Sequence, residues 1–161
     1  MDRAALRTTL TYRAHPRFTL GIEYNPLAGK VSPLANWLVV PEREHRPALM
    51  LGTSSDRIGT PNGQSFYATL GKSLKREIGL PLAPYVGVAY GTHEDKLRPI
   101  GGLAWKFSKH ADTLVIFDGV NVHPTMNLTI GRHVFTVLLV EAKNFGVGYS
   151  VAFKGPEQWL D

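Results

Sequence analysis

Residues 144–153, N-F-G-V-G-Y-S-V-A-F, alternate between large apolar and small side chains without a break. Successive side chains of a β-strand point to opposite faces, so one face of this segment is bulky and the other is small. The bulky face consists of Phe145, Val147, Tyr149, Val151 and Phe153. The small face carries no charge, although the outer face of a water-soluble sheet normally does. The segment therefore predicts a strand of a closed β-barrel whose large residues lie outside.

The same separation of large and small residues recurs along the chain. It is clear in residues 18–24, 84–91 and 101–107, weak in 33–53, and impossible to orient in 133–141, where both faces are apolar. No segment has the helical period that parallel crossover connections require, although residues 72–82 could hold one helical turn or a loop. The sequence thus predicts an all-β fold, an antiparallel up-and-down meander of about eleven strands closed into a barrel.

Closure follows from the cost of exposed sheet edges. A strongly twisted sheet of this size tends to close or split, and closure pairs the edge groups. Bacterial single-chain barrels have even strand numbers with both termini on the periplasmic side. We therefore expect one N-terminal strand and a signal peptide upstream of Met1, making twelve strands, unless a strand is miscounted in residues 33–53. We expect a barrel domain over residues 1–153 and a C-terminal tail over 154–161.

Composition restricts the functional classes. The 161 residues suit one domain, and the absence of cysteine excludes disulfides and thiolate metal sites. The net charge of +5 comes from scattered residues without a basic patch, which argues against nucleic-acid binding. No apolar run approaches the roughly 18 residues of a membrane helix, and the first residues, Met-Asp-Arg-Ala-Ala-Leu-Arg, lack the hydrophobic core of a signal peptide.

The cost of charge in hydrocarbon predicts which face meets lipid. A Lys or Arg near the membrane midplane costs about 2 to 4 kcal/mol, so charged strand residues should face the lumen. The lumen-facing candidates are Arg13, Glu23 and Lys106. Aromatic residues cluster near strand ends on the large face, as in interfacial girdles. We expect Phe18, Phe107 and Phe153 at one rim, and Tyr24, Phe66, Tyr90 and Phe145 at the other.

The C-terminal motif also carries a resemblance. Asn144, Gly146, Tyr149 and Val151, with Phe153 two residues further on, resemble the terminal β-signal by which bacterial outer-membrane barrels are handed to their assembly machinery. The wider stretch 83–153, with A-P-Y-V-G-V-A-Y-G, R-P-I-G-G-L-A-W-K-F and I-F-D-G-V-N-V-H-P, is similar to small outer-membrane-like barrel proteins of Gram-negative-type bacteria. The resemblance implies an outer-membrane location, with the lipid bilayer, lipopolysaccharide and the assembly machinery as partners. It implies no particular activity.

Signals for catalysis and for metal or cofactor binding are weak. A lipid hydrolase of the outer membrane needs a Ser nucleophile activated by a His. Ser54 and Ser55 are expected in a loop, Ser150 is a small inward residue, and His123 with Pro124 is expected in a turn. The six His are dispersed and lack the spacing of zinc ligands. We expect no cofactor and no metal, and a membrane lipid hydrolase stays a minor alternative.

Two functional classes remain. The first is a non-enzymatic membrane barrel, either a narrow pore or a structural component. The alternative is a soluble calycin-like barrel with its large faces turned inward around a small apolar ligand. Gly and Ala would then form most of the solvent surface, and only 19% of the chain is charged. The pattern favours the membrane barrel.

Overall fold

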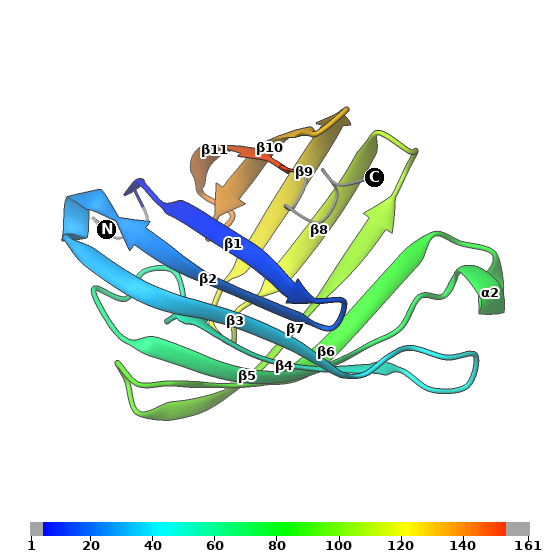
Figure 1. Cartoon of the computed structure of the whole chain (residues 1–161), viewed down its shortest axis with the longest axis horizontal. Helices are drawn as coiled ribbons and strands as arrows, with labels where there is room; N and C mark the ends of the chain where they lie inside the picture. Colours follow the sequence, from blue (N-terminus) through cyan, green and yellow to red (C-terminus); the bar gives the residue numbers. More distant parts are fainter. Residues whose placement is uncertain (1–4, 154–161) are drawn as a thin grey trace.

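A computed structural model describes residues 5–153 of the chain and shows eleven strands in one antiparallel sheet (Figure 1). Each strand pairs with its neighbours in the sequence, from β1 to β11. The all-β meander and the predicted number of visible strands are confirmed. The strands are β1 (Thr8–His15), β2 (Phe18–Asn25), β3 (Lys30–Val40), β4 (Ala48–Ser55), β5 (Gln64–Gly71), β6 (Leu82–Gly91), β7 (Lys96–Lys106), β8 (Ala111–Phe117), β9 (Val122–Ile130), β10 (His133–Val140) and β11 (Asn144–Val151).

Short connections join these strands. Two short helices lie in the connections between the strands, η1 (Pro26–Ala28) and α2 (Lys75–Ile78), so residues 72–82 do contain one helical turn. The β10–β11 connection places Glu141 and Ala142 at φ values of 55° and 52°, the left-handed region that tight hairpins require. The connection between β2 and β3 is short, because β3 already begins at Lys30.

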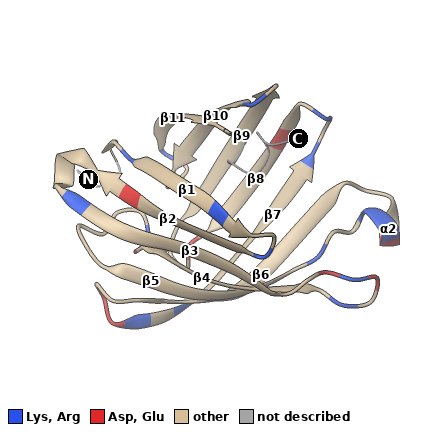
Figure 2. Ribbon diagram, viewed as in Figure 1, with Lys and Arg blue, Asp and Glu red and all other residues tan. Residues whose placement is uncertain are grey.

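The meander gives the sheet two rims. Rim A carries the connections that follow β2, β4, β6, β8 and β10. Rim B carries the connections that follow β1, β3, β5, β7 and β9. Figure 2 shows charged residues mainly near the strand ends and in the connections. The middle of the sheet therefore carries few charges.

The two faces of the sheet differ as predicted, with the large apolar side chains outward. In the described residues no apolar side chain is buried. Many large apolar residues of the outward face are exposed, among them Leu20, Val86, Phe135 and Val147 at 43 to 74%. The buried residues are all polar or charged: Glu23, Asn25, Ser32, Asp56, Thr60, Ser65 and His123. This distribution is the reverse of that in a water-soluble domain, where apolar side chains form the core.

The sheet is strongly curved but is not closed. β1 pairs with β2 and β11 pairs with β10, and no pairing joins β1 to β11 in the described residues. The predicted closed barrel is therefore absent from this structure, and every residue of β1 is exposed. Both edge strands run from rim A to rim B, so a direct pairing between them would be parallel in an otherwise antiparallel sheet.

Glycines on the inner face allow tyrosine side chains to lie flat across the sheet. A Cβ on Gly52 would stand 2.4 Å from the ring of Tyr67, and one on Gly102 would stand 2.5 Å from the ring of Tyr85. Tyr67 extends over Gly52 and donates a hydrogen bond to Asn36 Oδ1 at 2.6 Å. Two aromatic rings thus lie across the inner face, and the hydroxyl of Tyr67 is hydrogen-bonded there.

A substitution at Gly87 on β6 tests how closely the inner face is packed. A Cβ at Gly87 would lie 2.1 Å from the carbonyl oxygen of Ala68, so backbone must move. We expect Gly87→Ala to lower the free energy of unfolding by about 1 to 3 kcal/mol, measured by urea titration in detergent or lipid. Gly71→Ala is the matched control on the neighbouring strand, because its nearest contact would be Tyr85 Cβ at 3.4 Å. Equal stability of the two variants would contradict the close approach.

Candidate functional site

The predicted lumen-facing residues share one face but not one site. The pairing register places Arg13, Glu23 and Lys106 on the inner face of the sheet. Glu23 is 1% exposed near rim A. Arg13 and Lys106 are exposed near rim B, on strands far apart in the sheet order. The structure therefore separates Glu23 from the other two residues.

The predicted girdle residues lie at the expected rims. Strand direction places Phe18, Phe107 and Phe153 at rim B, and Tyr24, Phe66, Tyr90 and Phe145 at rim A. Phe107 contacts Trp105 with ring centroids 4.6 Å apart. The residues of the β-signal-like motif Asn144, Gly146, Tyr149 and Val151 all belong to β11, and Phe153 follows the strand. The expected tail over 154–161 lies outside the described residues.

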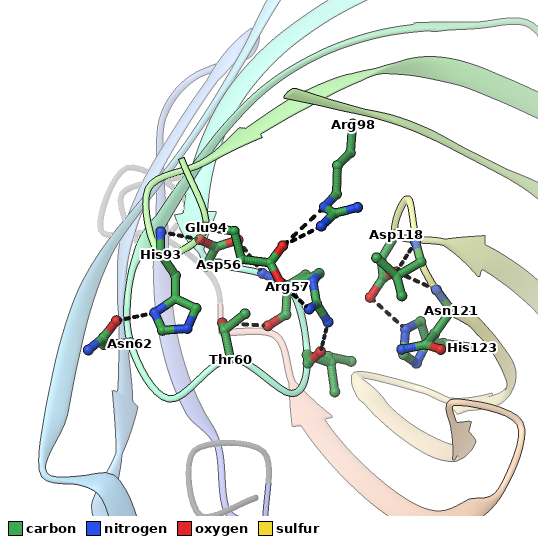
Figure 3. Close-up of polar contacts among 12 residues, drawn as sticks. Asp56, Arg57, Thr60, Asn62, His93, Glu94, Arg98, Asp118, Asn121 and His123 are labelled. Carbon is green, nitrogen blue, oxygen red and sulfur yellow. Dashed lines mark hydrogen bonds and ion pairs between the residues drawn. The ribbon is translucent and has the colours of Figure 1, made fainter. Parts of the chain in front are cut away.

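The interior near rim A holds a cluster of charged residues on the loop 56–63 and the strands around it (Figure 3). Asp56 is 8% exposed, and its carboxylate accepts hydrogen bonds from the backbone N–H groups of Arg57 at 2.8 Å and His93 at 3.0 Å. The backbone N–H of Asp56 donates to the Gly63 carbonyl at 3.1 Å. The His93 ring also lies 2.7 Å from Asn62 Oδ1. These bonds fix the base of loop 56–63 to the β6–β7 turn.

Glu94 is the centre of an ion-pair triad. Arg57 donates to Glu94 Oε1 at 2.7 Å, while Arg98 donates to Oε2 at 3.1 Å from Nε and at 2.5 Å from its terminal nitrogen. Hydrogen bonds from Arg57 and Arg98 lower the pKa of Glu94 to about 2. The bond to Glu94 in turn raises the pKa of Arg57. The triad is therefore fully charged at neutral pH.

A second ion pair lies beside the triad. Arg7 bonds to Glu23 Oε2 at 2.7 Å, and the amide of Asn25 donates to Glu23 Oε1 at 2.8 Å. Asn25 is completely buried. Arg7 and Asn25 thus supply polar partners to a side chain that is removed from water.

His123 forms a buried dyad with Asp118. The backbone N–H of Glu141 donates to His123 Nδ1 at 3.0 Å, so Nε2 carries the proton that is donated to Asp118 Oδ2 at 3.0 Å. Asp118 also accepts backbone hydrogen bonds from Val120 and Asn121. Both ring nitrogens of His123 are thereby engaged, and neither is left to activate a nucleophile.

Several of these positions correct the sequence predictions. His123 and Pro124 lie inside β9, not in a turn, and His123 is 2% exposed. Ser54 and Ser55 are the last residues of β4, not part of the following loop. The sequence did not single out Asp56, Arg57, Glu94, Arg98 or Asp118. Their only signal was membership of polar segments, because the contact between loop 56–63 and the β6–β7 turn depends on strand register.

Two cavities flank Arg57. One has a volume of about 160 Å³ and is lined by Tyr67, Tyr85 and Arg98 among others. The other has a volume of about 180 Å³ and is lined by Arg7, Glu23 and His123 among others. Arg57 and Asp118 line both cavities. Two small spaces therefore lie beside a cluster in which acidic and basic side chains are nearly balanced.

Within residues 5–153, no cluster of three or more His, Asp or Glu has a geometry that could hold a metal ion. No helix in the same range has the length and apolar character needed to cross a membrane. Comparisons with models of protein families, with curated proteins and with solved structures found no match.

The triad predicts a specific acid titration. Because the folded-state pKa of Glu94 lies below its usual value of 4.5, the triad stabilises the fold above pH 4.5 and loses this contribution as the pH falls toward about 2. We expect the ¹³C carboxyl resonance of Glu94 in the detergent-solubilised protein to titrate near pH 2. Glu94→Gln identifies the resonance. A midpoint near 4.5 would show that Arg57 and Arg98 do not hold this carboxylate.

Proposed function

We propose that this chain is an integral β-barrel protein of the bacterial outer membrane, non-enzymatic, that acts as a narrow pore. The observation that carries the proposal is the inverted distribution of side chains, with polar groups buried and large apolar groups exposed. Burial of apolar surface stabilises a protein by about 25 cal/mol per Å², so a water-soluble chain would not leave this face uncovered. Hydrocarbon around the sheet would remove the cost of exposing this apolar face to water.

Strand length and aromatic placement support the same conclusion. A tilted transmembrane strand needs about 9 to 11 residues, and the strands here have 7 to 11. Phe18 and Phe107 at rim B, with Tyr24 and Phe66 at rim A, would mark the two membrane interfaces. Leu20 and Ile22, between the rims on the outward face of β2, are 43 and 50% exposed. This arrangement matches an apolar band between two aromatic girdles.

We further propose that the sheet closes in the membrane with one additional strand. β1 and β11 both run from rim A to rim B, so an antiparallel neighbour of both must run from rim B to rim A. One such strand satisfies both open edges and gives the even strand number of bacterial barrels. A second copy of the sheet in the same membrane orientation would offer only parallel pairings. A twelve-stranded barrel is therefore the antiparallel solution with the fewest added strands.

The inner face supports a pore more than a binding or catalytic role. It carries the charged cluster and the cavities beside Arg57, and Arg13 and Lys106 extend its polar surface toward rim B. A calycin-like ligand site would need the large residues inside, whereas they are the exposed ones. We propose the bilayer with lipopolysaccharide as the surroundings of the outward face. The assembly machinery is the proposed partner of residues 144–153.

Two adjacent substitutions on β7 test the location. Leu103 points outward and is 39% exposed, and Ala104 points inward between Ala83 and Leu114. We expect Leu103→Arg to reduce recovery in the outer membrane strongly, because the charge costs up to about 2 to 4 kcal/mol in hydrocarbon. Ala104→Arg should still be recovered there, with the heat-dependent gel migration of a folded barrel.

The reverse order of tolerance would contradict a membrane barrel. So would recovery of the unsubstituted protein as a soluble monomer without detergent. Expression in a Gram-negative host with an outer-membrane export signal, followed by fractionation and gels of heated and unheated samples, measures both outcomes.

A further inference from the structure

We propose that Arg57 is the gate of the pore and that Glu94 is the latch that holds it closed. This inference rests on the proposed pore function and specifies how the pore is regulated. The geometry points to Arg57 because it has the longest side chain of the six residues that line both cavities, the others being Ser54, Ser55, Asp56, Ile116 and Asp118. Displacement of this one side chain would join spaces of about 160 and about 180 Å³ along the inner face.

Hydrogen bonds fix the base of loop 56–63 and also tie Thr60 to the Arg57 carbonyl, so the proposed motion is confined to the Arg57 side chain. Asp56 bonds to the backbone of Arg57, Gly63 and His93. Gly63 is so tightly enclosed that a Cβ there would lie 2.8 Å from both Asp56 Oδ2 and His93 Cβ. Gly59 and Gly63 adopt φ values of 96° and 103°, which only glycine adopts readily. The loop thus presents a long flexible side chain from a rigid base.

The latch is asymmetric, which allows Arg57 to leave while Glu94 stays in place. Arg98, on strand β7, makes two hydrogen bonds to Glu94 Oε2, whereas Arg57 makes one to Oε1. The Arg57 guanidinium also donates to the Ile58 carbonyl of its own loop at 3.3 Å. The side chains of Arg57 and Glu94 are 20 and 29% exposed, so water can reach both partners. An ion pair of this kind contributes modestly and can exchange for hydration. Arg98 retains Glu94 in position to recapture Arg57 (Figure 3).

The test is conductance of the full chain in planar lipid bilayers. We expect the unsubstituted protein to show small, infrequent openings. Arg57→Ala should raise the conductance by about twofold or more, because the two cavities merge. Glu94→Gln should leave the open-state conductance unchanged and increase the frequency of openings, because the latch loses its charge. A change in conductance thus identifies Arg57 as the gate, and a change in opening frequency alone identifies Glu94 as the latch.

Glu77→Gln is the matched control. Glu77 also forms an ion pair with a basic residue, Lys72, at 2.6 Å, but it lies in α2 at rim B and lines neither cavity. We expect its conductance and opening frequency to equal those of the unsubstituted protein. The heat-dependent gel migration of each variant confirms that it is folded before it is measured.

Three outcomes would overturn the gate. If the unsubstituted protein conducts, and Arg57→Ala and Glu94→Gln have the same conductance and opening frequency as it does, the gate is refuted and the pore function stands. An equal effect of Glu77→Gln would show a general consequence of losing ion pairs. If the folded protein inserts into the bilayer but no variant conducts, both the gate and the pore are refuted. If the protein does not enter the bilayer, the membrane location itself is refuted.

Discussion

The ion pair between the buried Glu23 and the half-exposed Arg7 shows the constraint on which this structure depends. A carboxylate at 1% exposure is tolerated only when charged and polar partners replace its water, and Arg7 and Asn25 do so. The other buried residues are also polar, and no apolar side chain of residues 5–153 is buried. The polar groups therefore specify the interior, and the apolar groups require an apolar exterior. In the proposed membrane location, hydrocarbon outside the sheet would satisfy both demands.

Curvature brings distant segments into this interior. Glycines such as Gly52 and Gly102 give room for Tyr67 and Tyr85 to lie along the concave face. Loop 56–63 then meets the β6–β7 turn, where Asp56 binds the His93 backbone and Arg57 reaches Glu94. The charged cluster thus results from packing within a single curved sheet. The same curvature brings β1 and β11 toward one side of the molecule, where their open edges run in the same direction (Figure 1).

Alternation along single strands predicted much of this arrangement, because side-chain direction depends only on a period of two. It anticipated the number of visible strands, the outward face of β11, and the inward direction of Glu23. It failed where both faces are apolar, as in β10, whose register shows Phe135 outward and Thr136 inward. It also missed His123 and the Arg57–Glu94 pair, because their partners lie on other strands. Closure depends on pairing at the sheet edges, which alternation does not determine.

The claim that the large face of β11 contacts lipid can be measured directly, because the chain has no cysteine. Single cysteines introduced at each of residues 145–150, spin-labelled in lipid vesicles, report the local accessibility of dissolved oxygen, which concentrates in hydrocarbon. We predict that oxygen accessibility alternates with a period of two. It should be high at Phe145, Val147 and Tyr149 and low at Gly146, Gly148 and Ser150. Uniform accessibility, or a maximum at Gly146, Gly148 and Ser150, would contradict it.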